Sequence, residues 1–88
     1  MILIEYHVEN PSGFHARPVS MLVKEACKYQ SAITFEKNGK VINCKSMMSV
    51  LSAAVGNGEK LTFSVTGGDE AEAAPDFESF LESVFKGA

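Results

Sequence analysis

The chain has 88 residues, which is enough for one small domain over residues 1–88 and too few for a deep substrate cleft beside the core. With 45% hydrophobic and 22% charged residues, its composition is that of a globular protein rather than a disordered one. The formal net charge of −3 argues against nucleic acid as the main partner, because binding to phosphates requires a basic surface.

The cysteine and hydropathy patterns predict a cytoplasmic protein. No run approaches the roughly 20 apolar residues that cross a bilayer, and the first residues lack the basic leader of a secretory signal peptide. Cys27 and Cys44 show no pairing pattern, so we expect two free, half-buried thiols in a reducing compartment. Together with His7 and His15, they lack the close ligand pairs of a zinc site, and we expect no metal and no other cofactor.

The first predicted elements are a strand and a helix. Residues 2–8 alternate between two faces, which predicts a half-buried strand, and residues 10–13 then carry turn chemistry. From Ala16 the apolar spacing becomes helical, with Pro18 in the first turn, where its missing N–H costs nothing. The core-facing stripe of this helix is expected to contain Ala16, Val19, Leu22, Val23, Ala26 and Cys27.

A hairpin is predicted next. Residues 32–36 indicate a strand with Ile33 and Phe35 facing inward. Residues 37–40 read Lys-Asn-Gly-Lys, and Asn-Gly suits both positive-φ positions of a type I′ turn. Residues 41–44 are therefore expected to return as the neighbouring strand.

Ser46 has the features of an N-cap for a short helix from Met47 to about Ala54, closed by the Gly-Asn-Gly of residues 56–58. Residues 60–66 alternate again and predict the fourth strand.

Asp69 is expected to cap a last helix. Pro75 would remove a hydrogen bond within it, so either the helix kinks or, as we favour, one turn ends and a new helix starts at Pro75. The core positions of this region are predicted to be Ala71, Ala74, Phe77, Leu81 and Val84. The order β-α-β-β-α-β-α, with one tight hairpin, predicts an α+β open-faced sandwich: a four-stranded, mostly antiparallel sheet with helices on one face.

Residues 10–18, Asn-Pro-Ser-Gly-Phe-His-Ala-Arg-Pro, place the imidazole of His15 between a turn and a helix start. The first N–H groups of a helix have no intrahelical partners and, with the helix dipole, favour an anion. A phosphoryl group on the nucleophilic ring could meet these N–H groups, and Arg17 could add a charge-assisted contact. The candidate catalytic residues are therefore His15 and Arg17. The candidate phosphate-binding residues are Ala16, Arg17 and Pro18.

The alternative for any lone histidine is a structural or idle role. We accept that interpretation for His7, which lies in a strand without a supporting motif. For Arg17 the alternative is a solvated charge, but an arginine in the first turn opposes the helix dipole, and this local cost favours a functional role.

Residues 13–18, Gly-Phe-His-Ala-Arg-Pro, resemble the active-site signature of HPr, the phosphocarrier family of the phosphoenolpyruvate-dependent sugar phosphotransferase system (PTS). Residues 45–50 are similar to the second signature of the family, and the resemblance covers essentially the whole chain. It implies that Enzyme I phosphorylates His15 on Nδ1 with the help of Arg17, and that the phosphoryl group passes to IIA domains of sugar permeases. A carrier that presents one histidine to two partners in turn is expected to be a monomer.

The same resemblance matches Ser46 to the position that an ATP-dependent HPr kinase phosphorylates in Gram-positive relatives during carbon catabolite repression, which would add a transcription regulator as a partner. A phosphate there would lie at a helix N-terminus, where it is tolerated. It would also lie beside Met47, Met48 and Leu51. With Met21, these residues are predicted to form a docking patch, although such methionines are more often core residues.

The chain departs from the family pattern at Ser49 and Ala54, which stand where glycine is common. Three other functions stay open: a regulatory binding protein acting mainly through Ser46, a nitrogen-related branch with the same chemistry, and a ferredoxin-like metal or nucleic-acid binder. Relatives with only the regulatory role lack the histidine, so His15 favours transport. The acidic charge and the absence of ligand pairs weigh against the last.

Overall fold

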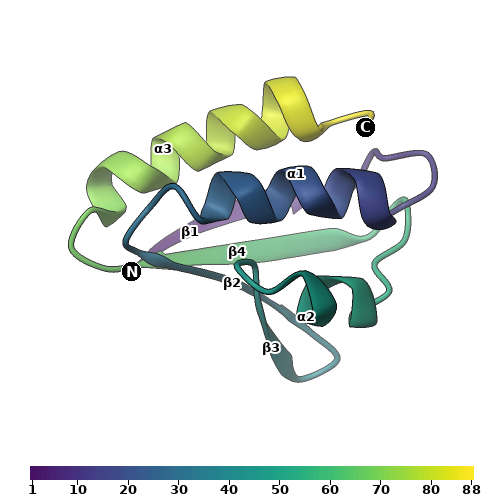
Figure 1. Cartoon of the computed structure of the whole chain (residues 1–88), viewed down its shortest axis with the longest axis horizontal. Helices are drawn as coiled ribbons and strands as arrows, with labels where there is room; N and C mark the ends of the chain where they lie inside the picture. Colours follow the sequence, from purple (N-terminus) through teal and green to yellow (C-terminus); the bar gives the residue numbers. More distant parts are fainter.

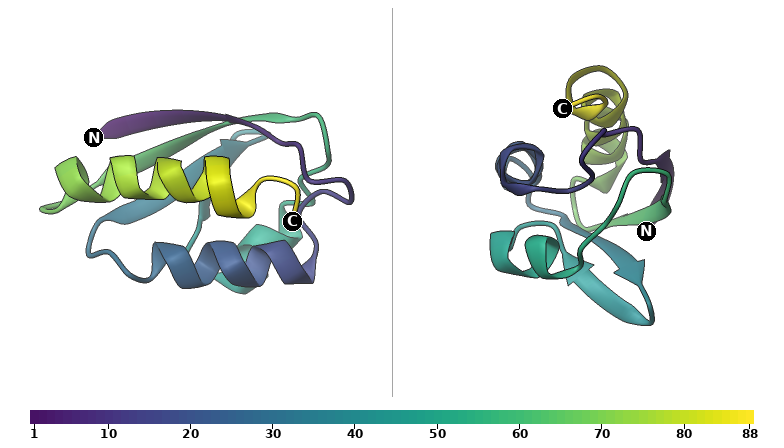
Figure 2. Two further views of the ribbon diagram at one scale, coloured as in Figure 1. Left: turned by 90° about the horizontal axis from the view of Figure 1, so that it is seen from above. Right: turned by 90° about the vertical axis from the view of Figure 1, so that its right-hand side faces the viewer.

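A computed structural model describes residues 1–88, and its four strands form one sheet in the order β1-β4-β2-β3. All three strand pairs are antiparallel. The helices cover one face of the sheet and leave the other open (Figures 1 and 2). The predicted α+β open-faced sandwich is therefore confirmed. The elements in chain order are β1 (Ile2–His7), α1 (Ala16–Ala26), β2 (Ala32–Lys37), β3 (Lys40–Asn43), α2 (Met47–Ser52), β4 (Lys60–Thr66), α3 (Glu70–Phe80) and the π-helical segment η1 (Leu81–Phe85).

The strands form as their alternation predicts, because every second side chain packs against the helices. Phe63 in the central strand β4 lies opposite Ile4 of β1 and Phe35 of β2, and all three are buried. In the β2–β3 turn, φ is 52° at Asn38 and 78° at Gly39, which confirms the two positive values of a type I′ turn.

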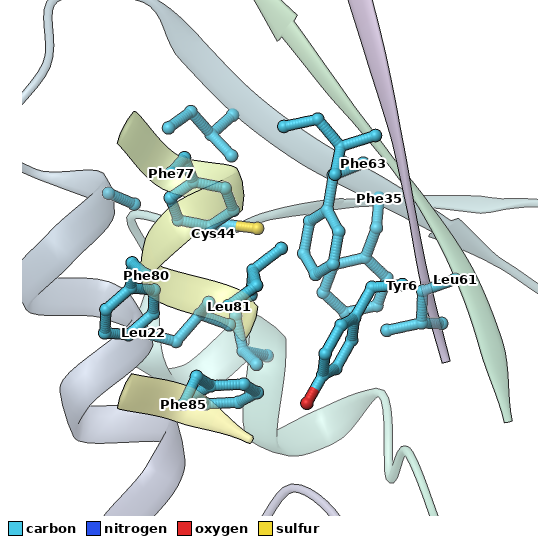
Figure 3. Close-up of a cluster of buried hydrophobic side chains, with 14 of the residues drawn as sticks. Tyr6, Leu22, Phe35, Cys44, Leu61, Phe63, Phe77, Phe80, Leu81 and Phe85 are labelled. Atoms are coloured by element: carbon cyan, nitrogen blue, oxygen red, sulfur yellow. The ribbon is translucent and has the colours of Figure 1, made fainter. Parts of the chain in front are cut away.

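One hydrophobic cluster of 22 buried residues lies between the sheet and the helices. Figure 3 shows part of it, with aromatic rings from the strands facing those of α3 and η1. The ring centroid of Phe63 lies 5.5 Å from that of Phe35 and 5.5 Å from that of Phe77, so one aromatic contact chain links β2, β4 and α3. This chain fixes α3 on the sheet.

The predicted core-facing stripe of α1 is confirmed at its centre and wrong at its ends. Its fully buried members are Val19, Leu22 and Ala26. Ala16 and Cys27 are exposed, because Ala16 is the first residue of the helix and Cys27 is its C-cap. The expectation of two half-buried thiols is also wrong, since Cys27 is exposed and Cys44 is fully buried. Burial raises the pKa of the Cys44 thiol well above its usual range, so this group stays protonated.

Helix α2 ends earlier than predicted. It stops at Ser52 with Ala53 as the C-cap, and the next residue, Ala54, has φ = 53°. Ala54 therefore ends the helix in the left-handed conformation that usually selects glycine. The Gly-Asn-Gly of residues 56–58 belongs to the following turn and does not close the helix.

Helix α3 runs unbroken through Pro75, so the predicted helix break is wrong. Pro75 is exposed, and its missing N–H leaves only the carbonyl of Ala71, also exposed, to be hydrated. Ala71 and Val84 were expected in the core but face solvent. The wider turn of η1 brings Phe85 instead of Val84 onto the buried side. Buried positions of α3 and η1 are Ala73, Ala74, Phe77, Phe80, Leu81 and Phe85.

Asp69 is the N-cap residue of α3, but its side chain does not cap the helix as predicted. The carboxylate instead accepts hydrogen bonds from the backbone N–H groups of Gln30 (3.0 Å) and Ser31 (2.9 Å) and from the Ser31 hydroxyl. Because these hydrogen bonds stabilise the charged form, the pKa of Asp69 lies below its usual value. Asp69 thus ties the start of α3 to the α1–β2 loop.

Candidate functional site

The candidate site lies at the N-terminus of α1, where His15 is the N-cap residue. Its backbone is extended, with φ = −97° and ψ = −176°, and its carbonyl accepts the N–H of Val19 at 3.0 Å to begin the helix. The imidazole is exposed and makes no capping hydrogen bond. The ring is therefore accessible, as the sequence predicts for a residue that meets other proteins.

The next two backbone N–H groups, those of Ala16 and Arg17, donate to no protein acceptor. Pro18 has no N–H, and its buried ring holds the first turn of α1 in place instead of donating a hydrogen bond. The first turn contains no acidic side chain, whereas the first turn of α3 contains Glu70 and Glu72. Two free amides and the positive end of the helix dipole thus lie beside His15, and the first turn of α1 holds no carboxylate to neutralise them.

Arg17 is exposed and takes part in no ion pair or hydrogen bond. The side chain of Lys24, two turns along the same helix, is likewise unpaired and exposed. Their charges are not compensated within the protein, so both are free to meet an anionic group. The first turn of α1 therefore carries one unpaired positive side chain and no acidic one.

Phe14 anchors the residue before His15 in the core. Its N–H donates to the carbonyl of Val55 at 2.8 Å. Its buried ring packs edge-on against Phe35 and Phe85, with ring centroids at 6.2 and 5.2 Å. Phe14 is thus buried, whereas the next side chain, that of His15, is exposed.

Gly13 brings the turn against the segment after α2. Its φ is +68°, and a Cβ at this position would lie 2.5 Å from the carbonyl oxygen of Val55 and 2.9 Å from Cα of Gly56. Only glycine fits this close backbone approach without a shift. The contact explains why glycine precedes Phe-His in this turn and places the His15 loop beside the end of α2.

Ser46 is the N-cap of α2, as predicted, and its Oγ accepts the N–H of Ser49 at 3.3 Å. Along the same helix, Met47, Met48 and Leu51 are 37%, 78% and 37% exposed. Met21 of α1 is only partly accessible and packs against the core. Three of the four predicted docking residues are therefore exposed together on α2, whereas the fourth, Met21, packs against the core.

The sequence patterns missed two residues that support the site, Asn10 and Val55. Asn10 was expected only as a turn residue, yet its side chain is fully buried. Val55 acts through its backbone carbonyl, for which the sequence carries no signal.

The ring Nε2 of His7 lies 3.2 Å from the carbonyl oxygen of Gly58 and can donate to it, which gives this histidine a structural contact of its own.

Two properties of the whole structure bear on the kind of site. No three His, Cys, Asp or Glu side chains come together in a way that could hold a metal ion. None of the helices has the length and hydropathy needed to cross a membrane.

The family model described as PTS HPr component phosphorylation site matches residues 3–83. The chain therefore belongs to the HPr family.

Individual relatives agree with this assignment. The HPr-like protein Crh of Halalkalibacterium halodurans is 38% identical over 82 residues, which cover 93% of this chain and 98% of Crh. The structure of HPr-C-His from Thermoanaerobacter tengcongensis superposes with a TM-score of 0.87 at 36% identity, covering 97% of this chain and 96% of that one. HPr from Bacillus anthracis superposes with a TM-score of 0.79 at 33% identity, covering 90% and 94%.

Proposed function

We propose that this HPr-family protein is a cytoplasmic phosphocarrier that accepts a phosphoryl group from Enzyme I on His15 and passes it to IIA domains of sugar permeases. The observation that carries the proposal is the exposed imidazole of His15 at the N-cap of α1, beside the unpaired N–H groups of Ala16 and Arg17. No resident cofactor is needed, because the phosphoryl group arrives already activated on the donor protein.

In the transfer, the Nδ1 lone pair of a neutral His15 attacks phosphorus, a nitrogen–phosphorus bond forms, and the bond from phosphorus to the donor breaks. Negative charge on the phosphoryl oxygens is met by the N–H groups of Ala16 and Arg17 and by the Arg17 guanidinium. Charge-assisted hydrogen bonds of this kind contribute about 1.5–3 kcal/mol each. They hold the group in line and lower the barrier for its transfer.

A carrier must also release what it accepts. A deep, fully enclosing pocket would stabilise the phosphorylated state so strongly that the onward step would slow. Two backbone amides and one mobile guanidinium on an open surface provide moderate stabilisation, and the acceptor can approach the same face that the donor leaves. Exposure of His15 is thus part of the mechanism.

The direct test is incubation of the protein with Enzyme I and phosphoenolpyruvate. The expected result is one acid-labile, alkali-stable phosphate on the wild type and on His7→Ala, and none on His15→Ala. His7→Ala is the matched control because it removes the other of the two histidines. Phosphate on His15→Ala, or none on a folded wild type, would refute the assignment.

The exposed surface of Met47, Met48 and Leu51 is proposed as the docking patch for Enzyme I and the IIA domains. Met48→Glu places a charge in this apolar surface and is expected to raise KM for Enzyme I about tenfold, as loss of a hot-spot contact does. Val84→Glu is the control, since Val84 is 54% exposed on η1, away from α2. Equal KM values for the two variants would exclude the patch.

Phosphorylation of Ser46 is proposed as regulation of this docking. A phosphate at the N-cap of α2 is compatible with the helix, because its oxygens can accept the Ser49 N–H that Ser46 Oγ already accepts. It would also place two negative charges beside Met47, where Enzyme I docks. Ser46→Asp should therefore slow phosphorylation of His15 while the protein stays folded. Equal rates for Ser46→Asp and the wild type would contradict this.

A second candidate function is regulatory binding through Ser46, which the 38% identity to an HPr-like Crh protein supports. A phosphoserine-dependent complex with a transcription regulator, formed equally well by His15→Ala, would establish it. The two functions are compatible, since they use different residues. If His15 accepts no phosphoryl group while phospho-Ser46 binds a regulator, the regulatory role stands alone.

We propose that the carrier acts as a monomer, because both partners use the surface around His15. A dimer of HPr from T. tengcongensis and a swapped dimer of Crh from Bacillus subtilis have been crystallised, so the assembly state of this chain needs its own measurement. Sedimentation at the concentrations used for phosphorylation is expected to give the mass of one chain. A dimer that is still phosphorylated at the full rate would overturn the monomer proposal.

A further inference from the structure

Asn10 is one of only two polar residues that are fully buried, the other being Ser31. Its amide makes three side-chain hydrogen bonds. Oδ1 accepts the Tyr6 hydroxyl at 3.0 Å, while Nδ2 donates to the carbonyl of Phe85 at 2.7 Å and to that of Ala88 at 3.3 Å. A fully satisfied buried amide fixes its neighbours in one arrangement, because any shift leaves a polar group unpaired.

The main chain of Asn10 belongs to the turn that leads to His15. Its carbonyl accepts the N–H of Gly13 at 2.8 Å and so closes residues 10–13. The buried side chain of Asn10 therefore holds one end of this turn. The backbone of Gly13, at the other end, packs against Val55. His15 follows two residues after Gly13.

The partner of Asn10 is the end of the last helix. η1 ends at Phe85, and its carbonyl is one of the helix-end acceptors that have no partner within the helix. The ring of Phe85 also lies 5.2 Å from Phe14, so Phe85 contacts the loop on both sides of Gly13. Figures 1 and 2 show the end of this helix beside the beginning of α1.

Tyr6 completes the network from β1. Its ring packs 5.9 Å from Phe85, and Figure 3 shows its hydroxyl at the end of the core where Phe85 lies. Burial raises the pKa of this hydroxyl to about 12, so it remains a donor to Asn10 over the whole working range of the protein.

We infer that Asn10 is a positioning residue: its buried amide, held by Tyr6 and Phe85, sets the turn that aligns His15 with the free amides of α1. The inference rests on the proposed phosphocarrier function. A ring displaced by about 1 Å from the line of transfer loses up to about two orders of magnitude in rate. Loss of the amide should therefore lower kcat with Enzyme I about tenfold, with KM unchanged because α2 is not disturbed.

Ser31→Ala is the matched control, because Ser31 is the other fully buried polar residue, and its hydroxyl donates to Asp69 from the loop that follows α1. Asn10→Ala and Ser31→Ala should both lower the free energy of unfolding, but only Asn10→Ala should lower kcat. Tyr6→Phe should reproduce part of the loss and add nothing to Asn10→Ala, as members of one network do.

A second readout does not need Enzyme I. Phosphoramidate transfers its phosphoryl group to an imidazole nitrogen as ammonia leaves, and a His7→Ala background leaves His15 as the only histidine. The hydrolysis rate of this phosphohistidine in folded protein is compared with that in urea-unfolded protein. Asn10→Ala should shift the folded rate toward the unfolded one, and Ser31→Ala should not.

The outcomes separate the two hypotheses. If Asn10→Ala keeps the wild-type kcat and hydrolysis rate while losing stability like Ser31→Ala, Asn10 is structural and the inference is wrong. A folded wild type whose hydrolysis rate equals the unfolded rate also overturns it. If Enzyme I does not phosphorylate the wild type, the proposed function fails, and the hydrolysis comparison still decides the role of Asn10.

Discussion

The close approach of Gly13 to Val55 gives the sharpest test of how the His15 loop is held. In Gly13→Ala, the positive φ costs about 1–2 kcal/mol, and the new Cβ would lie 2.5 Å from the Val55 carbonyl oxygen. Relief of such an overlap by a backbone shift costs about 1–3 kcal/mol more. The expected loss in free energy of unfolding is therefore about 2–5 kcal/mol.

Gly39→Ala is the matched control. Gly39 also has positive φ, at +78°, but no atom lies within 4 Å of an added Cβ. Its loss should be the conformational penalty alone, about 1–2 kcal/mol. Urea denaturation followed by circular dichroism at low temperature measures both values if the m-value stays constant. Equal losses for the two variants would show that the Gly13–Val55 contact does not constrain the loop in solution, and the account of the site would fail.

Three further changes test local features. Ala54→Gly should stabilise by about 0.5–1 kcal/mol, because Ala54 holds φ = 53°, while Ala53→Gly, in a right-handed conformation, should destabilise in the same urea assay. The hydrogen bonds of Asp69 lower its pKa below 3.8, so their stabilisation is complete above that pH and is lost as the pH falls through the folded pKa. Thermal melting should therefore show a smaller fall in the free energy of unfolding on acidification for Asp69→Asn than for the wild type. Asp76→Asn, at an exposed position, should behave like the wild type. Ser46→Ala should cost about 0.5–1 kcal/mol through loss of the N-cap, and Ser46→Asp, which keeps an acceptor, should cost less. A larger loss for Ser46→Asp would show that charge is not tolerated there.

The sheet and the helix carrying His15 were predictable because their signals are local. Alternation over residues 60–66 and the Asn-Gly pair at 38–39 each decide a conformation within a few residues. The N-cap position of His15 follows in the same way from a glycine turn before it and Pro18 after it. The motif also predicts a role for Arg17, whose side chain is exposed and forms no ion pair in the structure.

The features that sequence patterns missed depend on distant partners. The Asn10 side chain donates to a carbonyl 75 positions away, and the Asp69 carboxylate accepts from a backbone N–H 38 positions away instead of capping its own helix. Pro75 was expected to break α3, but the packing of Ala74 and Phe77 on the sheet outweighs the single missing hydrogen bond. Local sequence propensity does not predict such contacts, because they depend on residues that are far away in the sequence.

The proposed function places opposite demands on His15, because two partners would have to reach it and yet its ring would have to be aligned to a fraction of an ångström. Burial, the usual way to fix a side chain, is excluded for His15. The fold instead buries a residue on each side of His15. Phe14 comes directly before it, and Pro18 follows three residues after it. Phe14, the residue before His15, contacts Val55 and Phe85, which come from two segments distant in sequence. We infer that these contacts align the exposed ring. It follows that core substitutions around Phe14 should slow phosphoryl transfer more than exposed substitutions on α1 that leave Arg17 in place.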